Sequence, residues 1–168
     1  AVFSALSRRD ISEAMNQALG IEIFHNFTLL HDDVMDKADL RRGRPTVHRR
    51  WNENTAILSG DAMLTYASML MSRCPADRLA AVTDSFNSTA MGVYEGQQLD
   101  MEFERRHKVS IDEYLEMIKL KTSVLLAGAC AIGAIMAEAE ADVSRKLYDY
   151  GLALGIAFQL RDDWLDTF

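Results

Sequence analysis

Two acidic motifs far apart in the chain have the residue types and spacing best suited to chemistry. DDVMD at residues 32–36 and DDWLD at residues 162–166 each place carboxylates at positions i, i+1 and i+4 of an otherwise apolar helical pattern. Positions i and i+4 lie one turn apart on one helix face, so Asp32 and Asp36 can reach the same ion. Carboxylate oxygens suit Mg²⁺, whose shell is usually completed by water and substrate phosphates. Two such motifs facing each other would form a cage for a diphosphate.

An arginine-rich segment follows the first motif directly, and it includes Arg41, Arg42 and Arg44. Guanidinium groups offer planar forks of donors that match phosphate oxygens. Acidic residues at a helix C-terminus interact unfavourably with the helix dipole, so this motif destabilises the end of its helix unless a cation binds there. A solvated acidic helix end beside a basic loop is the alternative interpretation. The two features together favour a phosphate clamp made of metal and arginine.

Helical periodicity predicts the elements that carry these motifs. We expect helices over residues 13–36, 54–72, 76–104, 110–137 and 141–168, and a loop over residues 37–50. Ser110 with Glu113 has the spacing of a capping box. No strand pattern stands out, and the chain has only two prolines. The sequence therefore predicts a single all-α bundle.

The composition narrows the function classes. The net charge of −7 argues against a nucleic-acid partner, although metals and arginines can still bind an anionic substrate. Cys74 and Cys130 are isolated cysteines without metal-ligand spacing or a visible signal peptide, which favours a reduced, cytoplasmic protein. The uncharged stretch at residues 124–137 is short for a membrane span, so we predict a buried core helix there.

Five motifs in order closely resemble the trans-type isoprenyl diphosphate synthases, also called polyprenyl synthetases. They are LLHDDVMDKADLRRGRPTVH at 29–48, GDAML at 60–64, EGQQLD at 95–100, KT at 121–122 and GIAFQLRDDWLD at 155–166. The resemblance implies one synthase domain over residues 1–168, folded as an isoprenoid-synthase-type helical bundle around a central active-site cavity. It also implies a homodimer.

The activity implied by the resemblance is a Mg²⁺-dependent head-to-tail condensation. Isopentenyl diphosphate would add to an allylic diphosphate (dimethylallyl, geranyl or farnesyl) and give a C15–C20 trans-polyprenyl diphosphate. Loss of the allylic diphosphate leaves a carbocation, which the double bond of isopentenyl diphosphate attacks. The cationic adduct then loses a proton to the released diphosphate, which restores a double bond. The metal would stabilise the leaving group, and a dry pocket would keep water from the cation.

Roles follow by position from the same resemblance. The expected metal ligands are Asp32, Asp36 and Asp162, with Asp33, Asp163 and Asp166 as further candidates. The expected substrate contacts are His25, Arg41, Arg42, Lys121, Thr122 and Gln159. The expected catalytic residues are Asp32, Asp33, Asp36, Lys121, Gln159 and Asp162. The Lys121 charge and the Gln159 carbonyl would also stabilise the allylic carbocation.

The chain also departs from the family pattern. An upstream glycine-lysine-arginine segment and a downstream lysine-containing region are absent, so we expect the chain to lack N- and C-terminal parts. Two other classes remain open. A class I terpene cyclase would not need the Arg41-Arg42 pair and would normally carry a different second metal motif. A non-catalytic subunit of a heteromeric synthase would usually have lost one of the two motifs.

The resemblance further implies that product length depends on the helix before Asp32, where Phe24, Phe27 and Thr28 would form the floor of the pocket for the growing chain. A large residue at 27 with a small neighbour at 28 favours C20 slightly over C15.

We predict that Phe27→Ala lengthens the products, because the truncated side chain leaves room for a longer tail. Chromatographic sizing of the products of an active, full-length variant checks this, and an unchanged distribution would contradict it.

Overall fold

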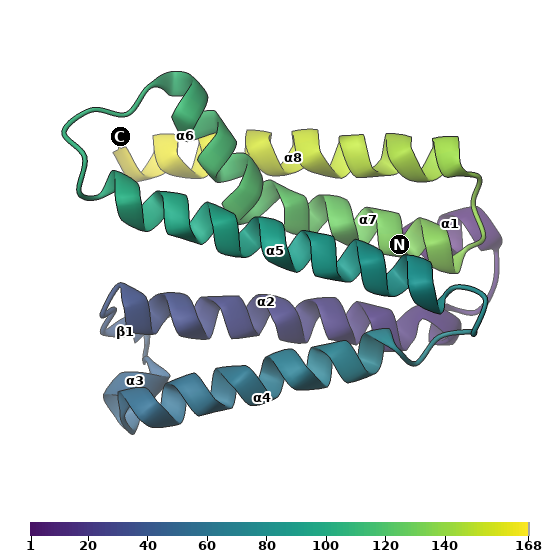
Figure 1. Cartoon of the computed structure of the whole chain (residues 1–168), viewed down its shortest axis with the longest axis horizontal. Helices are drawn as coiled ribbons and strands as arrows, with labels where there is room; N and C mark the ends of the chain where they lie inside the picture. Colours follow the sequence, from purple (N-terminus) through teal and green to yellow (C-terminus); the bar gives the residue numbers. More distant parts are fainter. Residues whose placement is uncertain (168) are drawn as a thin grey trace. The chain divides into compact units, whose positions relative to one another are not determined.

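The computed structural model describes residues 1–167, apart from the side chain of Asp166. The fold is all-α, as the sequence predicts, with one very short hairpin. The chain divides into two compact units (Figure 1). The second unit comprises Met15–Arg73, and the first unit comprises Ala1–Ala14 and the chain from Cys74 onward. Each unit carries one of the two acidic motifs.

The second unit is built on a pair of long helices. Its elements are α2 (Met15–Met35), β1 (Leu40–Arg41), β2 (Arg44–Pro45), α3 (Val47–Arg50) and α4 (Glu53–Met71). Helix α2 packs along α4 (Figure 1). At Gly20 on α2, a Cβ atom would come within 3.2 Å of the Ala67 carbonyl oxygen, so the glycine permits this close packing. The buried Gln17 amide donates to the carbonyls of Leu70 (3.3 Å), in the last turn of α4, and of Arg73 (3.1 Å), just beyond its end.

The segment after α2 is a hairpin and a helical turn, so the prediction of a loop over residues 37–50 was wrong in detail. Lys37 adopts the left-handed conformation (φ 53°), and the Ala38 N–H donates to the Asp33 carbonyl at 3.0 Å, which ends α2 in a Schellman motif. Arg42 (φ 52°) and Gly43 (φ 75°) then form the two-residue turn between β1 and β2. Strands of two residues are too short to show alternation, which is why no strand pattern stood out in the sequence.

The first unit is built around a central apolar helix. Its elements are α1 (Val2–Ser7), the 3₁₀ helix η1 (Ile11–Ala14), α5 (Leu79–Phe103), α6 (Ile111–Ile118), the π-helical turn η2 (Lys119–Ser123), α7 (Val124–Met136) and α8 (Ala141–Thr167). Helix α7 packs against both α5 and α8 (Figure 1). The capping box predicted at Ser110 is confirmed, since Ser110 Oγ accepts from the Glu113 N–H at 3.2 Å. The Ser110 N–H and the Arg106 guanidinium lower the pKa of Glu113 to about 2.

Among the described residues, one helical stretch, Ile111–Met136, is long and apolar enough to cross a membrane. Its α7 part is packed by two neighbouring helices, and Ala127 and Ala134 are fully buried. The packing is that of the buried core helix that the sequence predicts.

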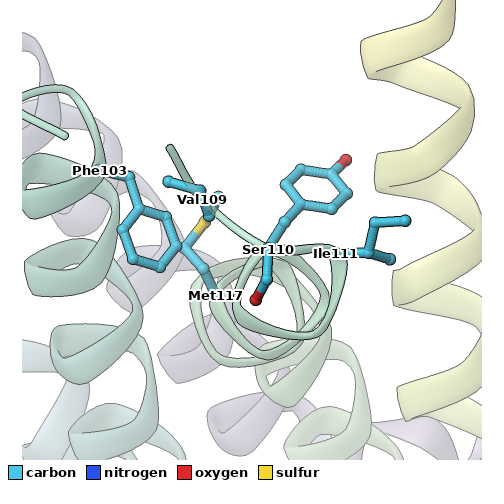
Figure 2. A pocket seen from close by; sticks show the side chains of 6 residues that line it. Phe103, Val109, Ser110, Ile111 and Met117 are labelled. Atoms are coloured by element: carbon cyan, nitrogen blue, oxygen red, sulfur yellow. The ribbon is translucent and has the colours of Figure 1, made fainter. Parts of the chain in front are cut away.

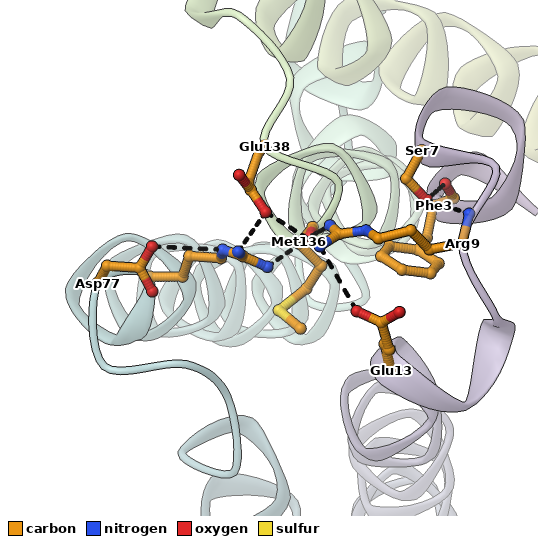
Figure 3. A network of polar contacts seen from close by, with 8 residues as sticks. Phe3, Ser7, Arg9, Glu13, Asp77, Met136 and Glu138 are labelled. Atoms are coloured by element: carbon orange, nitrogen blue, oxygen red, sulfur yellow. Dashed lines mark hydrogen bonds and ion pairs between the residues drawn. The ribbon is translucent and has the colours of Figure 1, made fainter.

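A polar network closes the end of α7 (Figure 3). The last carbonyl of the helix, on Met136, accepts from Arg9 Nη2 at 2.7 Å and from Arg78 Nη1 at 2.9 Å. Glu138 bridges the same two guanidinium groups. Because Arg9 comes from the N-terminal segment and Arg78 precedes α5, the network ties three parts of the first unit together.

We predict that Arg78→Met lowers the free energy of unfolding by about 1–3 kcal/mol, because methionine keeps the aliphatic volume but removes the charged donor at Met136. Urea unfolding followed by far-UV circular dichroism measures the change. Arg145→Met is the matched control, since Arg145 is exposed on α8 and no side-chain hydrogen bond or ion pair is seen for it among the described residues. Equal losses in the two variants would contradict the prediction.

Candidate active site

The first acidic motif is held by an arginine from the hairpin. Arg41 Nε donates to Asp33 Oδ1 at 2.9 Å, and Arg41 Nη2 lies 2.6 Å from the same oxygen and 3.3 Å from Asp32 Oδ2. Asp33 is 6% exposed, so its charge is buried and paired. The hydrogen bond to Asp33 raises the pKa of Arg41. The Schellman turn and the hairpin together return Arg41 to the end of α2.

The helical spacing continues through the rest of this motif. The Asp36 N–H donates to the Asp32 carbonyl at 2.9 Å, so the two carboxylates lie one turn apart. Asp32 is half-buried and Asp36 is exposed. Arg42, at the hairpin tip, is also exposed.

The residues expected to form the chain-length floor lie on α2. Phe24 and Phe27 are buried, with ring centroids 5.6 Å apart, and Thr28 is half-buried. His25 is half-buried two turns before Asp32, and its carbonyl accepts from Thr28 Oγ1 at 2.8 Å.

His31 explains the glycine of the GDAML motif. Its Nε2 lies 3.1 Å from the carbonyl oxygen of Ile57 on α4. A Cβ atom at Gly60 would come 2.2 Å from that same nitrogen, so only glycine leaves room for the imidazole ring. The glycine therefore serves helix packing close to the first motif.

Two side chains of the first unit bond to the second acidic motif, and a third bonds to one of these two. Asp163 Oδ1 accepts from Gln159 Nε2 at 2.8 Å, and Asp163 Oδ2 accepts from the Tyr114 hydroxyl. Thr122 Oγ1 donates to Gln159 Oε1 at 3.0 Å. Burial and then the contact with Asp163 raise the pKa of Tyr114 to about 12, so the phenol stays a donor at neutral pH.

Tyr114 contacts the second motif but is not among the site residues expected from the sequence. The available signal was its place seven residues, about two turns, before Lys121 on the helix that carries the KT motif.

Three further expected residues have distinct surroundings. Asp162 is exposed on α8. Lys121 Nζ lies 2.5 Å from Asp100 Oδ2, which joins the KT motif to the EGQQLD motif. The side chain of Asp166 lies outside the described residues, so its role stays a prediction.

Two glycines, one on α5 and one on α8, allow these helices to pack closely against the π turn η2, which carries the KT motif. A Cβ atom at Gly96 on α5 would come 2.1 Å from the Lys121 backbone nitrogen, and one at Gly155 on α8 would come 2.5 Å from Ser123 Cα. Both helices therefore reach backbone contact with η2. This brings Asp100 and Gln159 within hydrogen-bond distance of Lys121 and Thr122. Single π turns inside α-helices occur frequently at functional sites.

An open apolar pocket of about 400 Å³ lies between the end of α5 and the start of α6 (Figure 2). It is lined by Phe103, Val109, Ser110, Ile111, Tyr114 and Met117. Tyr114 of this lining also donates its hydroxyl to Asp163 of the second acidic motif. The pocket is thus adjacent to the second motif.

The protein donors fit a metal ion that is shared with a substrate. Among the described residues, no group of three or more His, Cys, Asp or Glu side chains could hold a metal ion alone. Mg²⁺ typically takes one or two carboxylates and completes its shell with water and substrate phosphates. Asp36 and Asp162, both exposed carboxylates, are suited to that kind of binding.

Comparisons with known proteins agree with this arrangement. The family model for polyprenyl synthetase matches residues 1–168. A geranylgeranyl diphosphate synthase of Methanosarcina mazei is 44% identical over 159 residues, which are 94% of this chain and 49% of that protein. A (2E,6E)-farnesyl diphosphate synthase of Mycobacterium tuberculosis is 39% identical over 156 residues, 93% of this chain and 44% of that protein. The chain spans about half the length of these curated relatives.

Solved structures also match this chain over nearly its whole length. A crystal structure of a geranylgeranyl pyrophosphate synthase has a TM-score of 0.95 at 51% identity and covers 98% of this chain and 50% of that chain. A polyprenyl synthase from Caulobacter crescentus, crystallised with calcium and isoprenyl diphosphate, has a TM-score of 0.89 at 35% identity and covers 98% of this chain and 49% of that chain.

We predict that Gly96→Ala lowers the free energy of unfolding by about 1–3 kcal/mol, because its new methyl group would overlap the backbone of η2. Gly92→Ala is the matched control one turn earlier on α5, where the nearest atom is a Val124 methyl carbon at 3.3 Å. Alanine is intrinsically favoured over glycine in a helix by about 1 kcal/mol, which offsets any crowding in the control. Denaturant unfolding of both variants tests this, and a Gly96→Ala variant as stable as Gly92→Ala would contradict it.

Proposed function

The chain belongs to the polyprenyl synthetase family, and from that premise we propose that it acts as a magnesium-dependent prenyltransferase. It condenses isopentenyl diphosphate head-to-tail with an allylic diphosphate and forms a C15–C20 trans-polyprenyl diphosphate. The observation that carries the proposal is the setting of the first acidic motif, in which Asp32 and Asp36 lie one turn apart while Arg41 is held against Asp32 and Asp33. Carboxylates for a metal and a guanidinium for phosphate are thus available side by side.

In this proposal Asp32, Asp36 and Asp162 hold Mg²⁺, which would stabilise the diphosphate as it leaves the allylic carbon. Arg41 contacts the allylic diphosphate. Its pairing with buried Asp33 supports this role, because the guanidinium is already oriented before substrate arrives. Arg42 and His25 contact isopentenyl diphosphate. Arg42 is exposed at the hairpin tip, where a phosphate could reach it.

The first unit contributes the residues that face the allylic cation. Lys121 and Thr122 line the allylic site, with Lys121 paired to Asp100 and Thr122 bonded to Gln159. The Gln159 carbonyl oxygen has a second lone pair besides the one that Thr122 uses, and we assign it to the developing positive charge.

Product length is set in this proposal by Phe27, with Phe24 one turn below it and Thr28 beside it. Both rings are buried and in contact, which supports a firm floor. The curated relatives include synthases named for geranylgeranyl, geranylfarnesyl and farnesyl diphosphates, which agrees with a short- to medium-chain product.

We further propose that the protein works as a homodimer in the cytoplasm, with dimethylallyl, geranyl or farnesyl diphosphate as the allylic substrate and without a nucleic-acid partner. The cysteines Cys74 and Cys130 are free, which supports a reducing compartment. The net charge of −7 supports the absence of a nucleic-acid partner.

We predict that chelation of Mg²⁺ abolishes incorporation of labelled isopentenyl diphosphate by the full-length protein and that added Mg²⁺ restores it. Asp162→Asn is expected to lower kcat by at least about 100-fold, because one carboxylate that stabilises the leaving group through the metal is lost. Asp149→Asn on the same helix is the matched control, since Asp149 is exposed and outside both motifs.

The assay uses a series of allylic primers, with products sized by chromatography. An active Asp162→Asn variant with unchanged kcat would contradict the metal assignment. A protein that incorporates no label with any primer would overturn the proposed activity. Release of a cyclic hydrocarbon without isopentenyl diphosphate would indicate a cyclase instead.

A further inference from the structure

The orientation of one amide group is decided by its neighbours in the first unit. The Gln159 side chain lies between Asp163, at 2.8 Å from its nitrogen, and Thr122, at 3.0 Å from its oxygen. An ionised carboxylate only accepts hydrogen bonds, whereas a hydroxyl can donate or accept. Asp163 therefore decides which end of the amide faces it, and the carbonyl oxygen is turned toward Thr122.

The Asp163 carboxylate is in turn held by a third side chain. Tyr114 on α6 donates its hydroxyl to Asp163 Oδ2, while Gln159 uses Oδ1. Each carboxylate oxygen thus has its own donor, and the group is held against rotation from two sides. The three side chains come from α6 and α8, and Thr122 adds the π turn η2 between α6 and α7.

We propose that Tyr114 is a positioning residue, which acts through Asp163 to hold the Gln159 carbonyl oxygen toward the allylic site. The catalytic part of this inference rests on the proposed function. When the bond between the allylic carbon and its diphosphate oxygen breaks, the electron pair leaves with the diphosphate and the carbon becomes positive. A carbonyl oxygen fixed beforehand stabilises that charge without reorganising, whereas a flipped amide would present its N–H donors to it.

The same contacts give Asp163 a role different from that of a metal ligand. With Tyr114 on one oxygen and Gln159 on the other, its carboxylate is engaged by protein donors on both sides. Asp162, its exposed neighbour, stays the metal-binding residue of the proposed function.

The first arm of the test measures the amide itself in the metal-free protein. Nitrogen-15 NMR identifies the Gln159 side-chain NH₂ signals by their loss in Gln159→Leu. Tyr114→Phe, which removes one oxygen atom, is expected to shift these signals and to speed their hydrogen exchange. Tyr150→Phe is the matched control, since Tyr150 is 62% exposed on α8. Unchanged Gln159 signals in Tyr114→Phe would overturn the proposal, whether or not the protein proves to be a synthase.

The second arm measures catalysis by the full-length protein. Tyr114→Phe is expected to lower kcat about tenfold, because a misplaced group is costly in the transition state, and to leave the KM values within about twofold. In the Gln159→Leu variant, Tyr114→Phe is expected to lower kcat no further, since Tyr114 acts only through the Gln159 amide. Additive losses would overturn the positioning role. Absence of activity in the unsubstituted protein, with the NMR shift present, would overturn the proposed function and leave the positioning of the amide established.

Discussion

Backbone contact at the π turn η2 is the constraint on which the site in the first unit depends. Gly96 and Gly155 let α5 and α8 approach closely enough that an added methyl group would overlap the turn from either side. At that separation Asp100 bonds to Lys121 and Gln159 bonds to Thr122. Helices normally lie 8–10 Å apart, with side chains filling the space between them. Here α5 and α8 have glycine instead of a side chain at the contact with η2, and polar side chains of the three elements bond to one another directly.

The two acidic motifs share a sequence pattern but differ in how their second aspartate is used. Asp33 is buried and paired with the positive charge of Arg41, whereas Asp163 is held by the neutral donors Tyr114 and Gln159. The first arrangement orients a cation that suits phosphate. The second orients an amide oxygen. In both motifs the second carboxylate orients a neighbouring side chain through hydrogen bonds, in addition to contributing negative charge.

Much of the fold could be predicted from periodicity and capping. The long helices and the capping box at Ser110 were anticipated because their signals are local, namely apolar spacing and a hydroxyl followed by a glutamate. The hairpin at Leu40–Pro45 was missed because its strands have two residues each. The π turn η2 was also missed, since its residues continue the same helical pattern and only the hydrogen-bond register differs.

The sequence by itself determined the all-α class, the family and the identities of the candidate ligands, because motif order and residue spacing are properties of the chain alone. Only the tertiary structure decided which of these residues are partners. That Arg41 pairs with Asp33, that Tyr114 reaches Asp163, and that glycines open the way to η2 depend on contacts between segments far apart in the chain. Hydrogen bonds act over about 3 Å, so their partners are fixed by packing, which sequence spacing does not encode.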